Sequence, residues 1–199
     1  TDSISISLIP QIDTLFFTGD SLMEIYDQQI HHALNKILAT KELNISGKLQ
    51  IKNLEPVNKL SSLQSLNISG TLLDDLYPIR NLIDLQDLNI SNTQIQELNP
   101  LIYSMSLRNL NLSYTKVSNL DPIANLTKIN VLNLSNTNID AIDAIAAFTN
   151  LHDLRMQNTM VTDLEILAGL SALSSLEIDN CSISSLESLS QVSELRYLS

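Results

Sequence analysis

Apolar residues recur along this chain with a fixed period of 22 residues. The unit that starts at Leu85 reads LQDLNISNTQIQELNPLIYSMS, and the unit that starts at Ile129 reads INVLNLSNTNIDAIDAIAAFTN. Unit 1 begins at Thr40 and is one residue longer, with the extra residue absorbed between Lys48 and Ile51. Units 2 to 8 begin at Leu63, Leu85, Leu107, Ile129, Leu151, Leu173 and Leu195. Self-similarity at a period of this size predicts a solenoid of stacked units.

Each unit opens with a short segment in which apolar and polar residues alternate. Leu88 and Ile90 occupy unit positions 4 and 6, while the polar residues Asp87, Asn89 and Ser91 occupy positions 3, 5 and 7. A period of two predicts a strand with one buried face. Apolar residues at positions 11, 14, 17 and 20 then carry the chain around the back of the same core. Because one unit cannot bury this face alone, the units must stack, with parallel strands about 4.8 Å apart.

The back of each unit carries a helix-start signal. Asp121 followed by Pro122 is typical of a helix N-cap with proline at the first helical position. Units 1 to 3 have a proline at the same place, and from Asp143 onward the proline is lost while Asp143, Glu165 and Glu187 keep the acidic residue. We therefore expect one short helical or 3₁₀ turn per unit.

These spacings match the leucine-rich-repeat pattern L-x-x-L-x-L-x-x-N-x-L over residues 40–199. The 22-residue length resembles the bacterial internalin class and its cousin, the eukaryotic phosphatase-regulator class. The resemblance implies an α/β fold, a right-handed solenoid with a parallel sheet on its concave face and short 3₁₀ or helical turns on its convex face. The sequence departs from the family at position 9, where its Asn is replaced by Thr71, Thr93, Thr115, Thr137, Thr159 and finally Cys181. We interpret these residues as a ladder of hydroxyl groups that bind loop backbone.

The two ends of the chain depart from the repeat. Residues 1–39 fit a degenerate first unit followed by a helix, which we expect to cap the stack; an independent N-terminal domain is the alternative. Ser21 and Glu24 would form a capping box if the helix began early. Because the chain starts at Thr1 and stops within a strand, we expect it to be a processed or partial chain.

The composition narrows the classes of partner. The net charge of −11 and the absence of Lys/Arg clusters along the sequence disfavour nucleic acid and anionic membrane surfaces. No apolar run is long enough to span a membrane. A single cysteine excludes an internal disulfide, which fits a cytosolic protein or a bacterial surface protein. Recurrent Asn-x-Ser/Thr sequons on the strands argue against a eukaryotic secretory route.

The repeat accounts for most candidate chemistry. Cys181 falls in the position 9 ladder and is expected to be buried and structural. His152 lies at the leading end of a strand, and the adjacent His31 and His32 lack the spacing of helix-borne metal ligands. The column formed by Asp121, Asp143, Glu165 and Glu187 could bind Ca²⁺, although turn capping explains each carboxylate. We therefore predict no catalytic residue, no metal and no cofactor.

Positions 3, 5 and 7 project from the concave sheet, where solenoids usually bind partners. In units 1 to 5 position 5 is always Asn and position 7 always Ser, which suggests side-chain amide ladders between strands. This monotony ends toward the C-terminus, where Tyr, Arg and Met suit an interface. The predicted partner-binding residues are Tyr114, Val131, Asp153, Arg155, Gln157, Met160, Glu177, Asp179 and Tyr197. Decay of the repeat near the end of the array is the alternative explanation.

The leading functional hypothesis is a non-catalytic module that binds a protein partner, in a bacterial protein presented at the surface or secreted. The alternatives are a cytoplasmic regulatory scaffold similar to the phosphatase-regulator proteins, a structural or adhesive surface segment with glycan as a less favoured ligand, and an enzyme whose catalytic domain lies outside this chain.

Overall fold

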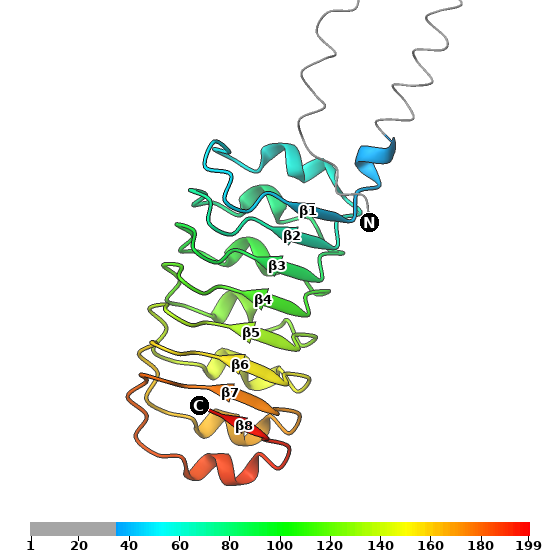
Figure 1. Ribbon diagram of the computed structural model, residues 1–199. Helices are drawn as coiled ribbons and strands as arrows, with labels where there is room; N and C mark the ends of the chain where they lie inside the picture. Colours follow the sequence, from blue (N-terminus) through cyan, green and yellow to red (C-terminus); the bar gives the residue numbers. More distant parts are fainter. Residues whose placement is uncertain (1–34) are drawn as a thin grey trace, which may run out of the picture.

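The computed structural model describes residues 35–199, which form a single stack of parallel strands (Figure 1). The eight strands follow one another in sequence order across one sheet, and all of them are parallel. They are β1 (Glu42–Asn44), β2 (Ser65–Asn67), β3 (Asp87–Asn89), β4 (Asn109–Asn111), β5 (Val131–Asn133), β6 (Asp153–Arg155), β7 (Ser175–Glu177) and β8 (Tyr197–Leu198). The expected cap over residues 1–39 lies almost wholly outside the described residues.

The register of the sheet repeats the register of the sequence. Leu66 pairs with Leu88, Leu88 with Leu110 and Leu110 with Leu132, so position 4 stacks on position 4 in successive units. In unit 1 Leu43 pairs with Leu66, which is 23 residues later, and the core again follows the 22-residue period from Leu54. The predicted one-residue insertion between Lys48 and Ile51 is thereby confirmed.

A short 3₁₀ segment forms the back of each unit, as expected, and Figure 1 shows these segments behind the strands. They are η2 (Glu55–Lys59), η3 (Tyr77–Ile79), η4 (Asn99–Leu101), η5 (Asp121–Ile123), η6 (Asp143–Ala147), η7 (Glu165–Gly169) and η8 (Glu187–Gln191). Proline at the second residue of η2 to η5 favours the turn because its φ is fixed and its missing N–H would have no partner there.

The core is a continuous column of aliphatic side chains from positions 1, 4, 6, 11, 14, 17 and 20. Leucines at position 4 of units 2 to 7 are all buried, from Leu66 to Leu176. Two residues at position 20 are not aliphatic: Ser104, which is buried, and Phe148, which is fully buried. The core becomes more exposed in unit 7, where Leu186 is 51% exposed, because only the two-residue strand β8 stacks beyond it.

The buried threonines at position 9 close the loop that follows each strand. The Oγ1 of each donates a hydrogen bond of 2.6–2.8 Å to the carbonyl three residues earlier, as Thr93 does to Ile90. This confirms the predicted hydroxyl ladder and explains why Thr can replace the family's Asn, since a single donor is enough. Cys181 does not repeat this bond: its Sγ lies 3.0 Å from the carbonyl of Met156 in the preceding unit, which also accepts from Thr159. The thiol is half-buried where full burial was expected.

The candidate binding surface

The exposed face of the sheet is built from positions 3, 5 and 7, and the asparagines at position 5 fix its geometry. In each of units 1 to 5 the Asn Oδ1 accepts the backbone N–H of position 7 at 2.9–3.0 Å, as Asn89 does from Ser91. The expectation of amide ladders between strands at position 5 was therefore wrong. These side chains bond within their own unit, because the N–H of position 6 donates to the position 5 carbonyl of the next unit, as Ile68 does to Asn89, whereas the N–H of position 7 has no backbone partner.

A shallow groove of about 260 Å³ runs along this face over β2 to β6. Its floor is formed by Asn67, Asn89, Asn111 and Asn133, and its far end is lined by Val131 and Arg155. The serines at position 7 contribute less surface than expected, because Ser113 and Ser135 are buried. The groove is therefore an asparagine-lined channel that meets the charged strands at its C-terminal end.

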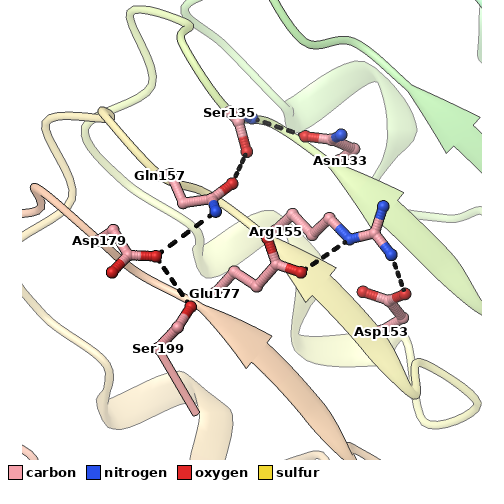
Figure 2. Close-up of polar contacts among 8 residues, drawn as sticks. All are labelled: Asn133, Ser135, Asp153, Arg155, Gln157, Glu177, Asp179 and Ser199. Carbon is pink, nitrogen blue, oxygen red and sulfur yellow. Dashed lines mark hydrogen bonds and ion pairs between the residues drawn. The ribbon is translucent and has the colours of Figure 1, made fainter. Parts of the chain in front are cut away.

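Arg155 on β6 lies at the centre of a cluster of charged residues (Figure 2). Its Nη2 lies 2.8 Å from Asp153 Oδ2, and its Nε lies 3.2 Å from Glu177 Oε1 on β7. The side chain of Arg155 is 42% exposed, whereas those of Asp153 and Glu177 are 18% and 21% exposed. Asp153 Oδ1 and Arg155 Nε are both buried, and neither has a hydrogen-bond partner among the described residues, so the Arg155–Glu177 contact is an ion pair without hydrogen-bond geometry. The cluster thus presents a partly exposed arginine side chain between two mostly buried carboxylates.

A second polar group continues this cluster toward the C-terminal end of the sheet. Ser135 Oγ donates to Gln157 Oε1 at 2.9 Å, and Ser199 Oγ donates to Asp179 Oδ2 at 2.8 Å. Gln157 Nε2 lies 3.5 Å from the same Asp179 oxygen, so the chain of contacts spans units 5 to 8 (Figure 2). Asp153, Arg155, Gln157, Glu177 and Asp179 therefore form one neighbouring set on units 6 and 7, with Gln157 and Asp179 just beyond the ends of β6 and β7.

The two charged residues at position 5 displace a stabilising contact. Arg155 and Glu177 stand where five earlier units have Asn, and neither accepts a backbone N–H. The N–H groups of Gln157 and Asp179 consequently donate to no described side chain. An intramolecular hydrogen bond of this kind contributes about 1 kcal/mol, so these two positions lose that contribution and have the Arg155–Glu177 ion pair in its place.

Tyr114 departs from the repeat in its backbone. Position 8 has a positive φ in every unit, and it is occupied by Gly47, Gly70 or Asn in all units but one. Tyr114 has a φ of 57° there, a conformation that Gly and Asn tolerate and that bulky side chains rarely adopt. It also interrupts an amide ladder in which Asn180 donates to Asn158 and Asn158 to Asn136, at 3.0 and 3.1 Å. Its ring is 61% exposed.

The remaining predicted residues lie around this set. Val131 on β5 is half-buried in the groove. Met160, at position 10, and Tyr197, on β8, are exposed, and no hydrogen bond or ion pair joins either side chain to the charged cluster. Tyr114 lies at the loop after β4 and likewise makes no such contact.

The acidic residues at position 15 do not cap the 3₁₀ segments. Each is the first residue inside the segment, and the N-cap is the preceding Leu or Ile, as Leu120 is before Asp121. The capping acceptor lies two residues earlier, at position 13, where Asn119 Oδ1 accepts the Asp121 N–H at 2.8 Å. Residues 53, 75, 163 and 185 act in the same way. The predicted capping role was therefore wrong by two positions.

The acidic column does not assemble into a metal site. Over residues 35–199, no group of three or more His, Cys, Asp or Glu side chains is arranged to hold a metal ion. His31 and His32 lie outside the described residues, and His152 is exposed at the start of β6. Within the same part of the chain, no helix has the length and apolarity needed to cross a bilayer.

Comparison with known proteins identifies the repeat. A family model described as "Leucine Rich repeats (2 copies)" matches residues 106–147, and no curated protein matches the sequence. Among solved structures, an internalin (InlF) of Listeria monocytogenes is 28% identical with a TM-score of 0.79. The match covers 82% of this chain and 48% of that one, so the chain spans about half the length of InlF.

Two further internalins of the same organism share the fold. Internalin C2 is 24% identical with a TM-score of 0.72, covering 79% of both chains. The functional domain of InlJ is 19% identical with a TM-score of 0.66, covering 80% of this chain and 38% of that one. The chain is therefore a leucine-rich-repeat solenoid. Its repeats resemble those of internalins, a fold that commonly serves as a protein-interaction module and is typically non-catalytic.

Proposed function

We propose that this chain is a non-catalytic module that binds a protein partner on the exposed face of its sheet. The observation that carries the proposal is that three residues on or beside this face stand where the repeat otherwise has an Asn that supports its backbone. Tyr114, Arg155 and Glu177 each replace an Asn that the repeat uses for backbone geometry or hydrogen bonding. Arg155 and Glu177 exchange the lost hydrogen bond for an ion pair with each other, and Tyr114 makes no compensating contact among the described residues. Residues that break a local rule of the fold in this way are characteristic of functional surfaces.

The geometry fits a partner that lies along the groove and ends on the charged cluster. Arginine and tyrosine are enriched among the residues that dominate binding energy. Arg155 is held by two carboxylates, which fixes its orientation before a partner arrives. We therefore assign the contact to Tyr114, Val131, Asp153, Arg155, Gln157, Glu177 and Asp179, with Met160 and Tyr197 at its margin.

We also infer a bacterial protein that is presented at the surface or secreted. The support is the similarity to internalins of Listeria monocytogenes, together with a single cysteine and no reliance on disulfides. Detection of the protein by antibody on intact cells or in the medium would agree with this inference, and recovery only from the cytoplasmic fraction would contradict it.

The binding proposal is tested by site-specific photo-crosslinking followed by affinity measurement. A photoreactive amino acid at Asn133, on the groove floor, should trap a partner that mass spectrometry identifies. The double substitution Tyr114→Asn with Arg155→Gln should then lower the affinity for that partner at least tenfold. Both replacements are small and polar, and circular dichroism should remain that of the wild type.

A matched control uses a tyrosine on another surface. Tyr103 is exposed on the back of unit 3, so Tyr103→Asn should leave the affinity for the sheet-face partner unchanged. Equal binding by the wild type and the double variant would refute the assignment of the contact surface. A partner trapped at Asp143, on the back, but not at Asn133 would have the same consequence.

A further inference from the structure

A second surface lies on the leading edge, which we define as unit positions 18–22 and 1–2, where the back of each unit runs into its strand. In units 2 and 3 this edge exposes four large apolar side chains. They are Ile83, Ile102, Tyr103 and Met105, of which Tyr103 is 68% exposed. At position 21 the other units have Ser or Thr, so Ile83 and Met105 are departures from the repeat. Nothing in the 22-residue core pattern requires an apolar residue there.

These side chains gather into one patch because neighbouring units stack. Residues 22 positions apart lie side by side, which brings Ile83 next to Met105 and Arg80 next to Ile102. The 3₁₀ segments η3 and η4, which precede these residues, contact each other. A contiguous exposed apolar patch on a chain with mostly polar outward positions marks an interaction site.

The same edge carries a local positive charge. Over residues 58–64, 80–86, 102–108 and 124–130 there are four basic residues and one acidic residue, Asp84. The basic residues are Lys59, Arg80, Arg108 and Lys128. No ion pair within residues 35–199 involves any of them. They are 20 to 28 residues apart in sequence, which is why the sequence shows no basic cluster although the fold creates one.

Arg80 is already oriented. Its guanidinium carbon lies 3.8 Å from the centre of the Tyr77 ring, and its Nη1 donates to the Tyr77 carbonyl at 2.8 Å. The remaining N–H groups donate to no described residue. A planar guanidinium held in this way is suited to bidentate binding of a carboxylate.

We propose that the leading edge of units 1 to 4 is a docking surface for an acidic protein segment that carries apolar side chains. The apolar patch would bury the apolar side chains, and the basic rim would bind the carboxylates. Nucleic acid makes poor use of exposed Ile and Met between the cations, and a net charge of −11 repels a polyanionic membrane at long range. This surface is distinct from the sheet face and does not depend on it.

The test uses the full chain and a fluorescent amphipathic peptide of Leu and Glu. The net negative charge of the chain should repel such an acidic peptide, so binding would show that the peptide contacts the local basic and apolar surface. We expect measurable binding that weakens with salt, because charge pairs at a rim are screened. We expect at least a tenfold loss of affinity for Ile83→Ser with Met105→Ser, and likewise for Arg80→Gln with Arg108→Gln. Serine is the residue of other units at position 21, so the fold should tolerate the first pair.

The matched control is Arg196→Gln, a cation at position 2 of unit 8, far from the patch, which should leave affinity unchanged. No binding by the wild type, or equal binding by both edge variants, would overturn the proposal. The chain could instead bind phosphatidylserine vesicles or a single-stranded DNA oligonucleotide and not the peptide. If the edge variants abolished that binding, the edge would be assigned to another class of ligand. Self-association through this edge would show that its occupant is a second copy of the chain. A cross-link within one molecule, from a Met105→Cys label to residues 1–34, would show that the occupant is the chain's own acidic segment.

Discussion

Position 8 of the unit holds a residue, Tyr114, that suits the backbone less well than the Gly or Asn of the other units. A left-handed backbone costs a non-glycine residue about 1–2 kcal/mol unless its side chain compensates, and Asn does so through local hydrogen bonds. Asn136, Asn158 and Asn180 bond to one another across three units, whereas Tyr114 makes no such contact. The tyrosine therefore remains at this position for a reason other than the stability of the solenoid.

Replacement of this tyrosine should stabilise the protein. We expect Tyr114→Asn to raise the free energy of unfolding by about 1 kcal/mol, because Asn tolerates the positive φ and can join the ladder. Urea denaturation of the variant beside the wild type measures the change. Tyr103→Asn, on an ordinary backbone, should show no such gain, and an unchanged or lower stability for Tyr114→Asn would contradict the strain argument.

The charged cluster makes the opposite prediction at Arg155. Substitution Arg155→Gln leaves Asp153 and Glu177 without their shared counter-charge, and both carboxylates are mostly buried. We expect a loss of about 1 kcal/mol in stability at low salt, partly recovered when Glu177→Gln is added. Arg196→Gln breaks only the exposed pair with Glu194 and should have no measurable effect. A loss unaffected by Glu177→Gln would show that the pairing is not its cause.

At the scale of the element, the sequence indicated the right turn and assigned its cap to the wrong residue. Proline and an acidic residue at the start of the 3₁₀ segment suggested capping by position 15. The N-cap is instead the buried Leu at position 14, and the acceptor side chain comes from position 13. Position 13 varies among Asn, Asp, Ser, Glu and Ala, so no single residue type marked it in the sequence.

This reassignment can be tested in unit 4. Asn119→Ala removes the acceptor for the Asp121 N–H and should cost about 1 kcal/mol, the usual value of a capping side chain. Asp121→Ala removes only a charge near the start of a three-residue turn and should cost under about 0.5 kcal/mol. Thermal or urea unfolding of the two variants separates the assignments, and the reverse order of losses would restore position 15 as the cap.

Repetition determines how much of this structure could be predicted. Strand register, the inward positions and the threonine ladder followed from the spacing alone, because every unit repeats the same solution. The groove floor was predicted in part, since the Asn at position 5 was found but its partner within the unit was not. The basic and apolar leading edge was missed, although Ile83 and Met105 already differed from the Ser and Thr of other units. Only stacking brings such residues together.

At the scale of the whole molecule, the solenoid places basic and acidic residues on different surfaces, which the net charge of the sequence does not reveal. The chain has a net charge of −11, yet Lys59, Arg80, Arg108 and Lys128 lie along one edge of the stack. The sheet face beyond β5 combines Asp153, Glu177 and Asp179 with the single cation Arg155. Because neighbouring units sit about 5 Å apart, a feature that recurs at one position over three units covers about 10–15 Å of surface.

The same stacking predicts how core mutations combine. Leu110 pairs directly with Leu132, whereas Leu176 lies three units away from Leu110. Each Leu→Val change should cost about 1 kcal/mol by leaving a small cavity. Leu110→Val with Leu176→Val should be additive, because distant residues in a solenoid share no contacts. Leu110→Val with Leu132→Val should deviate from additivity by about 0.5 kcal/mol or more, since the two cavities adjoin. Urea titrations of the singles and doubles measure both couplings, and equal couplings for the near and distant pairs would show that the stack behaves as one unit rather than as a chain of neighbours.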